Sequence, residues 1–383
     1  MTTTQASPPA PGSAAARPTP SPPALAPTSY PHIWDQILFY ADQATFSALR
    51  ATCSTLYGEV AARLYNHVEV HLTKQTDRLH IDLCAPYTHR RLPGLDFATN
   101  PVLCLDRLYL FCTSLDEVVH GVPVLHDVCD AALDTFGALE RALENVTVHR
   151  VNAEYYWSLF SLPQVRKVVA FLHPKPDPYA GYESEEDDFP DPLAMPLFLA
   201  TPGPSVRGVI INVTIGATGF RADSLQHMAN LERIGIIVHK GDAPPPAPLR
   251  WCAGLSGLFT SLAPLFPRVK VVISGLEALP DKWLSTNVVP TGASERRHHL
   301  CKEIALWIRC CQVLSAGKGT EWAASLEKGD GDEVIGIGPI MESISVKSLE
   351  QMRESIGDGA FDMFMIPPAA WCVQVNAGNG AGQ

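Results

Sequence analysis

The sequence predicts an α/β protein in which a small helical module near the N-terminus precedes a larger array of alternating strands and helices. Three observations support this prediction. Apolar residues recur at helical spacing between residues 30 and 67. A short pattern of alternating apolar residues returns several times between residues 64 and 274, and stretches with helical spacing lie between its copies.

Composition limits the classes of function that the chain can have. Of its 383 residues 46% are hydrophobic, which is enough for a sizeable core, and the net charge of -11 argues against binding to a phosphate backbone. The ten cysteines form no CxxC pair and mostly lie in apolar runs, as buried free thiols do in a reducing compartment. The chain shows no secretory signal and no apolar run of about 18 residues. We therefore expect a cytoplasmic or nuclear protein that binds neither nucleic acid nor membrane.

The helical module comprises residues 29–67. Its first helix carries one apolar stripe, a second short helix can begin near Thr45, and Ser54 is a suitable N-cap for a third. The stripe of the first helix consists of Ile33, Trp34, Ile37, Leu38 and Ala41. A core of three such short helices is small for an independent domain, so the module is expected to dock on a partner or on the adjoining domain.

The order of residues in this module resembles the F-box-like domain of fungal proteins. The resemblance rests on the segments Pro31-x-Ile33-x3-Ile37-Leu38-x-Tyr40-Ala41, Leu49-Arg50-x2-Cys53-x2-Leu56-Tyr57 and Leu64-Tyr65. The chain has Tyr30-Pro31 where the family begins with Leu-Pro, and Ala41 where the family often has leucine.

This resemblance implies binding to a Skp-family adaptor and, through it, to the cullin of a ubiquitin ligase. The adaptor-facing positions of the family correspond here to Pro31, Ile33, Ile37, Leu38 and Leu49. The alternative is that the same side chains only form a helical core packed on the next domain.

The array is predicted over residues 68–375. Its template is an apolar residue, two others, and then apolar residues in alternation. Copies begin at Leu143, Val165, Val206, Leu231 and Phe266, and weaker ones include Leu64-x3-Val68-x-Val70-x-Leu72 and Leu105-x2-Leu108-x-Leu110. Helices are expected between the copies, the longest over residues 295–313. Repeated strand–helix units are typical of leucine-rich-repeat proteins, and the competing fold is an ordinary α/β sheet with parallel strands.

Three segments are expected to lack regular structure. They are the proline-rich tail 1–28, the C-terminal residues 376–383, and a proline-rich acidic loop at 173–205 between two strands.

The sequence contains no pattern that defines a reaction. Gly254-Leu255-Ser256-Gly257 lacks the spacing of a nucleophile elbow. His298 and His299 are adjacent, so on a helix they point about 100° apart and do not easily share a metal ion. We therefore expect that the protein is not an enzyme, has no catalytic residue, and binds no metal and no cofactor. The predicted function is substrate recognition for a Skp–cullin–F-box-type ubiquitin ligase, with an unidentified protein target. The alternatives are an interaction scaffold that does not engage a ligase and an enzyme whose site the sequence does not reveal.

The target-binding surface is expected on the concave face of the array, at positions that alternate with the template. These positions include Thr147 and His149. On the later strands they carry about one large apolar residue each, namely Val169, Phe171, Ile210, Ile237 and Val272. Clustered apolar residues on an exposed sheet face mark a binding surface. The alternative is that a helix or the 173–205 loop covers them.

Overall fold

A computed structural model provides the structure of the chain. It describes residues 54–75, 78–86, 91–92, 95–120, 135–152, 160, 162–172, 204–214, 223–239, 258–276, 293–318 and 336–366, together with residues 33, 34, 37, 41, 45, 48 and 49. The chain divides into two compact units, residues 1–60 and 61–383, which are described separately below. Most of the predicted 173–205 loop and both predicted tails lie outside the described residues.

The first unit is helical wherever it is described within the predicted module, except at Ala41. Residues 33, 34 and 37 are helical, as are residues 45, 48 and 49. Helix α3 (Ser54–Tyr65) begins at Ser54, the residue that the sequence predicts as its N-cap, and thus starts one residue earlier than predicted. The boundary between the two units falls within this helix. Val60 and Leu64 of this helix are buried.

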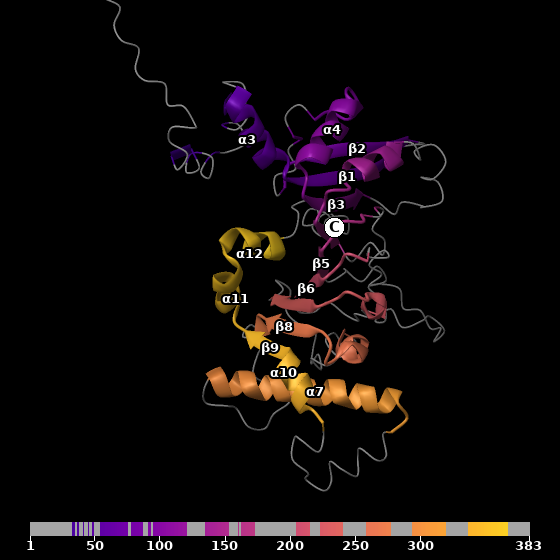
Figure 1. Ribbon diagram of the computed structural model, residues 1–383, viewed down its shortest axis with the longest axis vertical. Helices are drawn as coiled ribbons and strands as arrows, with labels where there is room; N and C mark the ends of the chain where they lie inside the picture. The colour runs from indigo at the N-terminus through magenta and orange to yellow at the C-terminus, as the bar shows by residue number, and fades with distance from the viewer. Residues whose placement is uncertain are drawn as a thin grey trace, which may run out of the picture. The chain divides into compact units, whose positions relative to one another are not determined.

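The second unit is built on a nine-stranded sheet in the order β2-β1-β3-β4-β5-β6-β7-β8-β9. Only β1 and β2 pair antiparallel, and every other neighbouring pair is parallel. The strands are β1 (His67–Gln75), β2 (Arg78–Cys84), β3 (Ser114–His120), β4 (Val148–Asn152), β5 (Lys167–Leu172), β6 (Gly208–Thr214), β7 (Arg233–His239), β8 (Lys270–Ser274) and β9 (Ile344–Lys347). β3 lies beside β1, and from β4 onward each strand lies beside the one that precedes it in the chain (Figure 1).

A recurring hydrogen bond aligns the starts of these strands. The carbonyl of Asn66 accepts the N–H groups of Thr113 and Ser114, both at 2.9 Å, just before β1 and β3 begin. The same pair of hydrogen bonds to one carbonyl recurs at the next four junctions, where the accepting carbonyls belong to Thr113, Thr147, Arg166 and Arg207. Each new strand therefore begins at the level of its predecessor, and the sheet grows by one strand at a time.

Two faces of this sheet are distinguished by their residues. The outer face carries Val168, Ala170, Ile211 and Ile236, all of which are template positions and are buried. The inner face carries the alternating positions, which include Val169, Phe171, Ile210 and Ile237. The prediction that template positions enter a core is confirmed for β5 to β8.

The prediction for β4 is wrong in register, because the template places Val146 where the sheet has His149. This offset of three residues exchanges the two faces of the strand. Val148 pairs with Lys167 and His149 with Val168, so His149 lies on the outer face. Thr147 precedes the strand. Because side chains alternate along a strand, a shift by an odd number of residues moves every side chain to the other face. Val148 and Arg150 therefore occupy the inner face.

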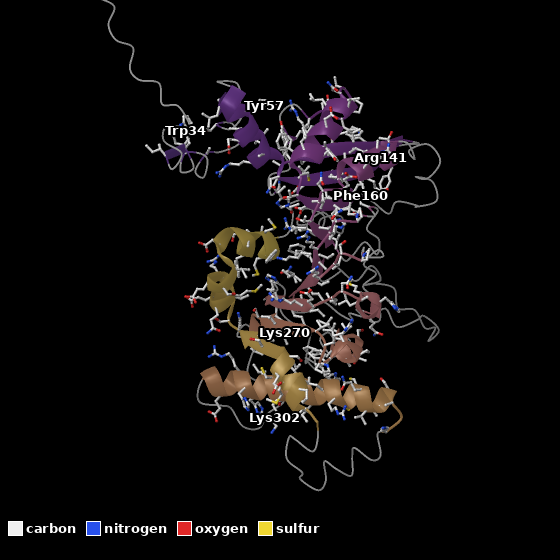
Figure 2. The ribbon with its side chains drawn as sticks, viewed as in Figure 1. Trp34, Tyr57, Arg141, Phe160, Lys270 and Lys302 are labelled. Carbon is white, nitrogen blue, oxygen red and sulfur yellow. The ribbon has the colours of Figure 1, made fainter. Side chains whose placement is uncertain are left out.

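The helices of the second unit lie on both sides of the sheet and at its β9 end (Figure 1). They include α4 (Pro101–Phe111), η2 (Asp223–His227), η3 (Ala263–Leu265), α7 (Ala293–Ser315), α10 (Gly338–Ser343), α11 (Leu349–Ile356) and α12 (Asp358–Met365). Helix α7 confirms the longest predicted helix. Residues 135–142 are also helical, and Phe160 stacks on Phe136 of this helix with ring centroids 4.9 Å apart. Figure 2 labels Phe160 and Arg141, a residue of the same helix.

Residues 105–110 do not form the weak strand that the sequence predicts. They belong to α4, whose N-cap Asn100 accepts the N–H of Leu103 at 3.1 Å and whose first residue is Pro101. An Asn cap followed by proline strongly favours a helix start. Leu105, Leu108 and Leu110 consequently point in different directions around the helix.

Candidate interaction surfaces

The predicted adaptor-binding residues are described in part. Ile33 and Leu49 are half-buried, and Ile37 exposes 39% of its surface. Pro31 and Leu38 lie outside the described residues. Ile37 is therefore an apolar side chain of the module that solvent reaches directly.

The predicted target-binding face is not exposed. Val169, Phe171, Ile210 and Ile237 are all buried, and Phe171 and Ile237 expose only 1% and 0% of their surfaces. Val272 is half-buried. The prediction of an accessible concave face is therefore wrong for four of its five residues, and the middle of the sheet is buried on both sides.

Helices α11 and α12 form the cover over this face. Met352 from α11 and Phe361 and Phe364 from α12 are buried in one apolar cluster with Val118, Val169, Phe171, Ile210 and Ile237. Gly357 joins the two helices at a φ of +82°, a conformation that side chains with a Cβ rarely adopt, so the tight turn favours glycine. The cover thus consists of two short helices that follow the last strand.

A buried polar group lies beside this cluster on the inner face. Glu69, Asp116 and Arg150 are neighbours across β1, β3 and β4 in the register of the sheet, and all three are 0% exposed. Arg150 donates to Asp116 Oδ2 at 2.8 Å, and His67 Nε2 lies 2.8 Å from Asp116 Oδ1. A buried carboxylate is stable only when charged or hydrogen-bonding partners compensate for its loss of water, and here two cationic or donating groups do so.

Arg150 also connects the sheet to the cover. Its Nη2 donates to the carbonyl of Ile366, which is the C-cap residue of α12. A cation at a helix C-terminus interacts favourably with the unpaired carbonyls there. The guanidinium lies over the Phe171 ring, 5.1 Å from its centroid, which adds a cation–π contact. Arg150 thus contacts the charged group, the apolar cluster and the end of α12 together.

Two further His–carboxylate pairs accompany this group. His71 Nε2 lies 3.0 Å from Glu69 Oε2 on the inner face, and His149 Nε2 lies 3.1 Å from Glu117 Oε2 on the outer face. Sequence reasoning named His149, but on the wrong face, and missed the other residues of these pairs. An ionisable residue at every second position of His67-Val-Glu69-Val-His71 is an unusual pattern for a buried strand face.

Chemically, these polar residues act as a structural network. Their ionisable groups bind one another, and Asp116 and Arg150 have no contact with solvent, so a substrate from solution does not reach them in this arrangement. Within the described residues, no group of three or more His, Cys, Asp or Glu side chains is placed to hold a metal ion. His299 instead pairs with Glu303 at 3.3 Å, one helical turn away.

Two buried cysteines, Cys112 and Cys84, are unsuited to nucleophilic chemistry. Burial raises the pKa of Cys112 to about 12, and its thiol donates to the carbonyl of Ser114 at 3.3 Å. Burial likewise raises the pKa of Cys84 to about 11, with Asp82 nearby as a second cause. A thiol acts as a nucleophile only as the thiolate, which is scarce at neutral pH for such groups.

A shallow cleft of about 760 Å³ lies along the outside of the cover. It is lined by Leu349, Glu350, Arg353, Glu354, Gly357, Asp358, Phe361 and Met365. Arg353 lies over the Phe361 ring at 4.7 Å and reaches Asp358 at 3.5 Å, so this arginine already occupies part of the cleft.

Comparison of the chain with protein-family models, with curated proteins and with solved structures found no match. Among the described helices, none is long and apolar enough to cross a membrane.

Proposed function

We propose that this chain is a substrate-recognition subunit of a Skp–cullin–F-box-type ubiquitin ligase. Residues 29–67 serve as the F-box-like module, and the strands that follow serve as a leucine-rich-repeat-like array. In this role the chain carries no catalytic residue of its own, since the ligase supplies the chemistry.

The observation that carries the proposal is the order of the sheet, which follows chain order from β3 to β9 behind a short helical module. In a doubly wound α/β sheet the strand order reverses near the middle, and the crossover helices cover both faces. Here no reversal occurs among these strands, and the helices that cover the inner face in the described part of the chain follow the last strand. Growth by one unit at a time favours a repeat array over an ordinary parallel sheet.

Because α11 and α12 cover the inner face, the target-binding surface in this proposal lies elsewhere than the sequence predicts. Removing α11 and α12 from the sheet would expose Met352, Phe361 and Phe364. At about 1.5–3 kcal/mol for each buried side chain, their exposure costs about 5–9 kcal/mol. That is as much as the stability of a whole domain. The target contacts therefore lie on surfaces other than the covered inner face.

The experiment is copurification of the Skp-family adaptor and cullin with the full chain. Ile37→Asp places a charge on an already exposed adaptor-facing position, and we expect it to reduce adaptor recovery at least about tenfold without unfolding the module. Ala48→Asp changes another exposed helical position of the module and serves as the control. Circular dichroism of both variants verifies the fold. Unchanged recovery with Ile37→Asp contradicts the proposal.

A second candidate is an F-box-like scaffold that no longer engages a ligase. Ala41, which is half-buried, favours it because the family often has the larger leucine there. Absence of both adaptor and cullin from the purified wild-type complex supports this scaffold.

A further inference from the structure

Helix α4 is apolar on the side that faces away from the core. Val102 and Leu110 expose 67% and 66% of their surfaces, Tyr109 exposes 47% and Leu103 exposes 37%. At 100° per residue, these side chains and Asp106 fall within about 120° of the helix circumference. We call these five residues the α4 stripe.

The buried side of α4 lies opposite the stripe. Cys104 and Leu108 are both 0% exposed. Helix α4 therefore has two apolar sides, whereas a surface helix of a monomer typically has one apolar side, which faces the core, and one polar side. Contiguous exposed apolar residues of this kind mark a binding surface.

The helix is held in place before any partner arrives. Arg107 donates to the hydroxyl of Tyr65 at 2.9 Å and lies over its ring at 5.5 Å. Asn145 donates to the carbonyl of Tyr109 at 3.0 Å. A surface fixed in this way loses little conformational entropy on binding.

A single charged residue lies at the centre of the stripe. Asp106 is the middle residue of α4, it is exposed, and no described residue forms an ion pair or hydrogen bond with it. If a second copy packed its stripe symmetrically on this one, Asp106 would face Asp106 in a water-excluded contact, which is unfavourable. A Lys or Arg at that point would instead pair with Asp106 and approach the ring of Tyr109.

The tails of the chain do not supply such a partner. Residues 1–28 contain eight prolines and a single charge, Arg17, and residues 367–383 contain no Lys or Arg. A net charge of -11 also favours attraction of basic partners to the chain as a whole.

We propose that the α4 stripe binds an amphipathic helix of another protein, with apolar residues at i, i+3 or i+4, and i+7 and a Lys or Arg placed against Asp106. This is helix-on-helix recognition by apolar anchors around one ion pair. It does not depend on the ligase role, because the second unit alone carries the stripe.

The test is site-specific photo-crosslinking of the full-length protein. The photoreactive residue p-benzoylphenylalanine replaces Leu110, the protein is irradiated in an extract of the cells that produce it, and mass spectrometry identifies the attached peptide. The same residue at Leu314, which is 62% exposed on α7, is the matched control. We expect the Leu110 variant alone to capture a helical segment with the stated apolar spacing and a basic residue.

Charge reversal then tests the ion pair with the captured partner. Asp106→Lys should weaken binding about tenfold, and replacing the partner's basic residue by Glu should restore it. Capture of a segment without the apolar spacing or the basic residue overturns the proposal. So does attachment to a second copy or to another segment of this chain, the absence of any attachment, or an Asp106→Lys variant that binds as well as wild type.

Discussion

Arg150 joins more parts of the second unit than any other residue described above. Its guanidinium pairs with Asp116, approaches His67, lies over the ring of Phe171 and donates to the end of α12. A buried ion pair gives little net stability compared with a well-packed apolar pair, but removal of one partner leaves an uncompensated charge. The importance of Arg150 therefore lies in the groups that depend on it.

We expect Arg150→Met to lower the free energy of unfolding by about 3–5 kcal/mol, because Asp116 would keep its burial and lose its cation. The measurement is urea denaturation. The exposed pair Arg207 and Glu232, at 3.4 Å, gives the control, since Arg207→Met should cost less than about 1 kcal/mol. The double variant Arg150→Met, Asp116→Leu should recover at least half of the loss. Strict additivity of the two single changes would show that the pair does not act as a unit.

At the scale of elements, the cover depends on short helices with well-defined ends. Helix α11 has only eight residues, too few for stability in isolation. Its N-terminus compensates through a capping box, in which Ser348 Oγ accepts the N–H of Gln351 and the Gln351 side chain accepts the N–H of Ser348, both at 3.1 Å. Cap and packing together hold the helix on the inner face.

Ser348→Ala should therefore destabilise the protein by about 0.5–2 kcal/mol and speed amide hydrogen exchange in α11 first. Ser355→Ala is the control within the same helix. The exposed Ser355 hydroxyl donates to the carbonyl of Met352 at 2.9 Å, and its loss should change stability by less than about 0.5 kcal/mol. Equal effects of the two changes would argue against a specific role of the cap.

At the scale of the whole molecule, the last described helices cover a sheet whose final strand is β9. The inner face of β3, β5, β6 and β7 presents Val118, Val169, Phe171, Ile210 and Ile237 to α11 and α12. Without the cover this face would be a large apolar patch, which favours aggregation. The cover is thus part of the folded core of the second unit.

Two truncations test this role of the cover. A chain that ends at Lys347 lacks α11 and α12, and we expect its Tm to fall by at least about 10 °C and its binding of the hydrophobic dye ANS to rise. A chain that ends at Ile366 keeps both helices and the carbonyl that Arg150 binds, and should behave as the full-length protein does. If the shorter chain keeps its Tm and binds no dye, α11 and α12 are a removable lid.

The sequence by itself determined the features that depend on neighbouring residues. Period-two alternation located β5 to β8 and their outer-face residues, such as Val168 and Ile236, and helical spacing located α7. These predictions succeed because the repeat of a strand or helix is a local property of the chain.

Only the tertiary structure decided which surfaces are covered. Phe171 and Ile237 alternate with the template positions, so the sequence predicts that they are exposed. Helices α11 and α12 nevertheless bury them, and α11 begins at Leu349, 178 residues after Phe171 and 112 residues after Ile237. The inward position of Arg150 depends on the pairing of β4 with β3 and β5, and the stripe on α4 became visible only once residues 101–111 proved helical. Burial results from contacts between distant segments, and periodicity records only which residues share a side, not what packs against that side.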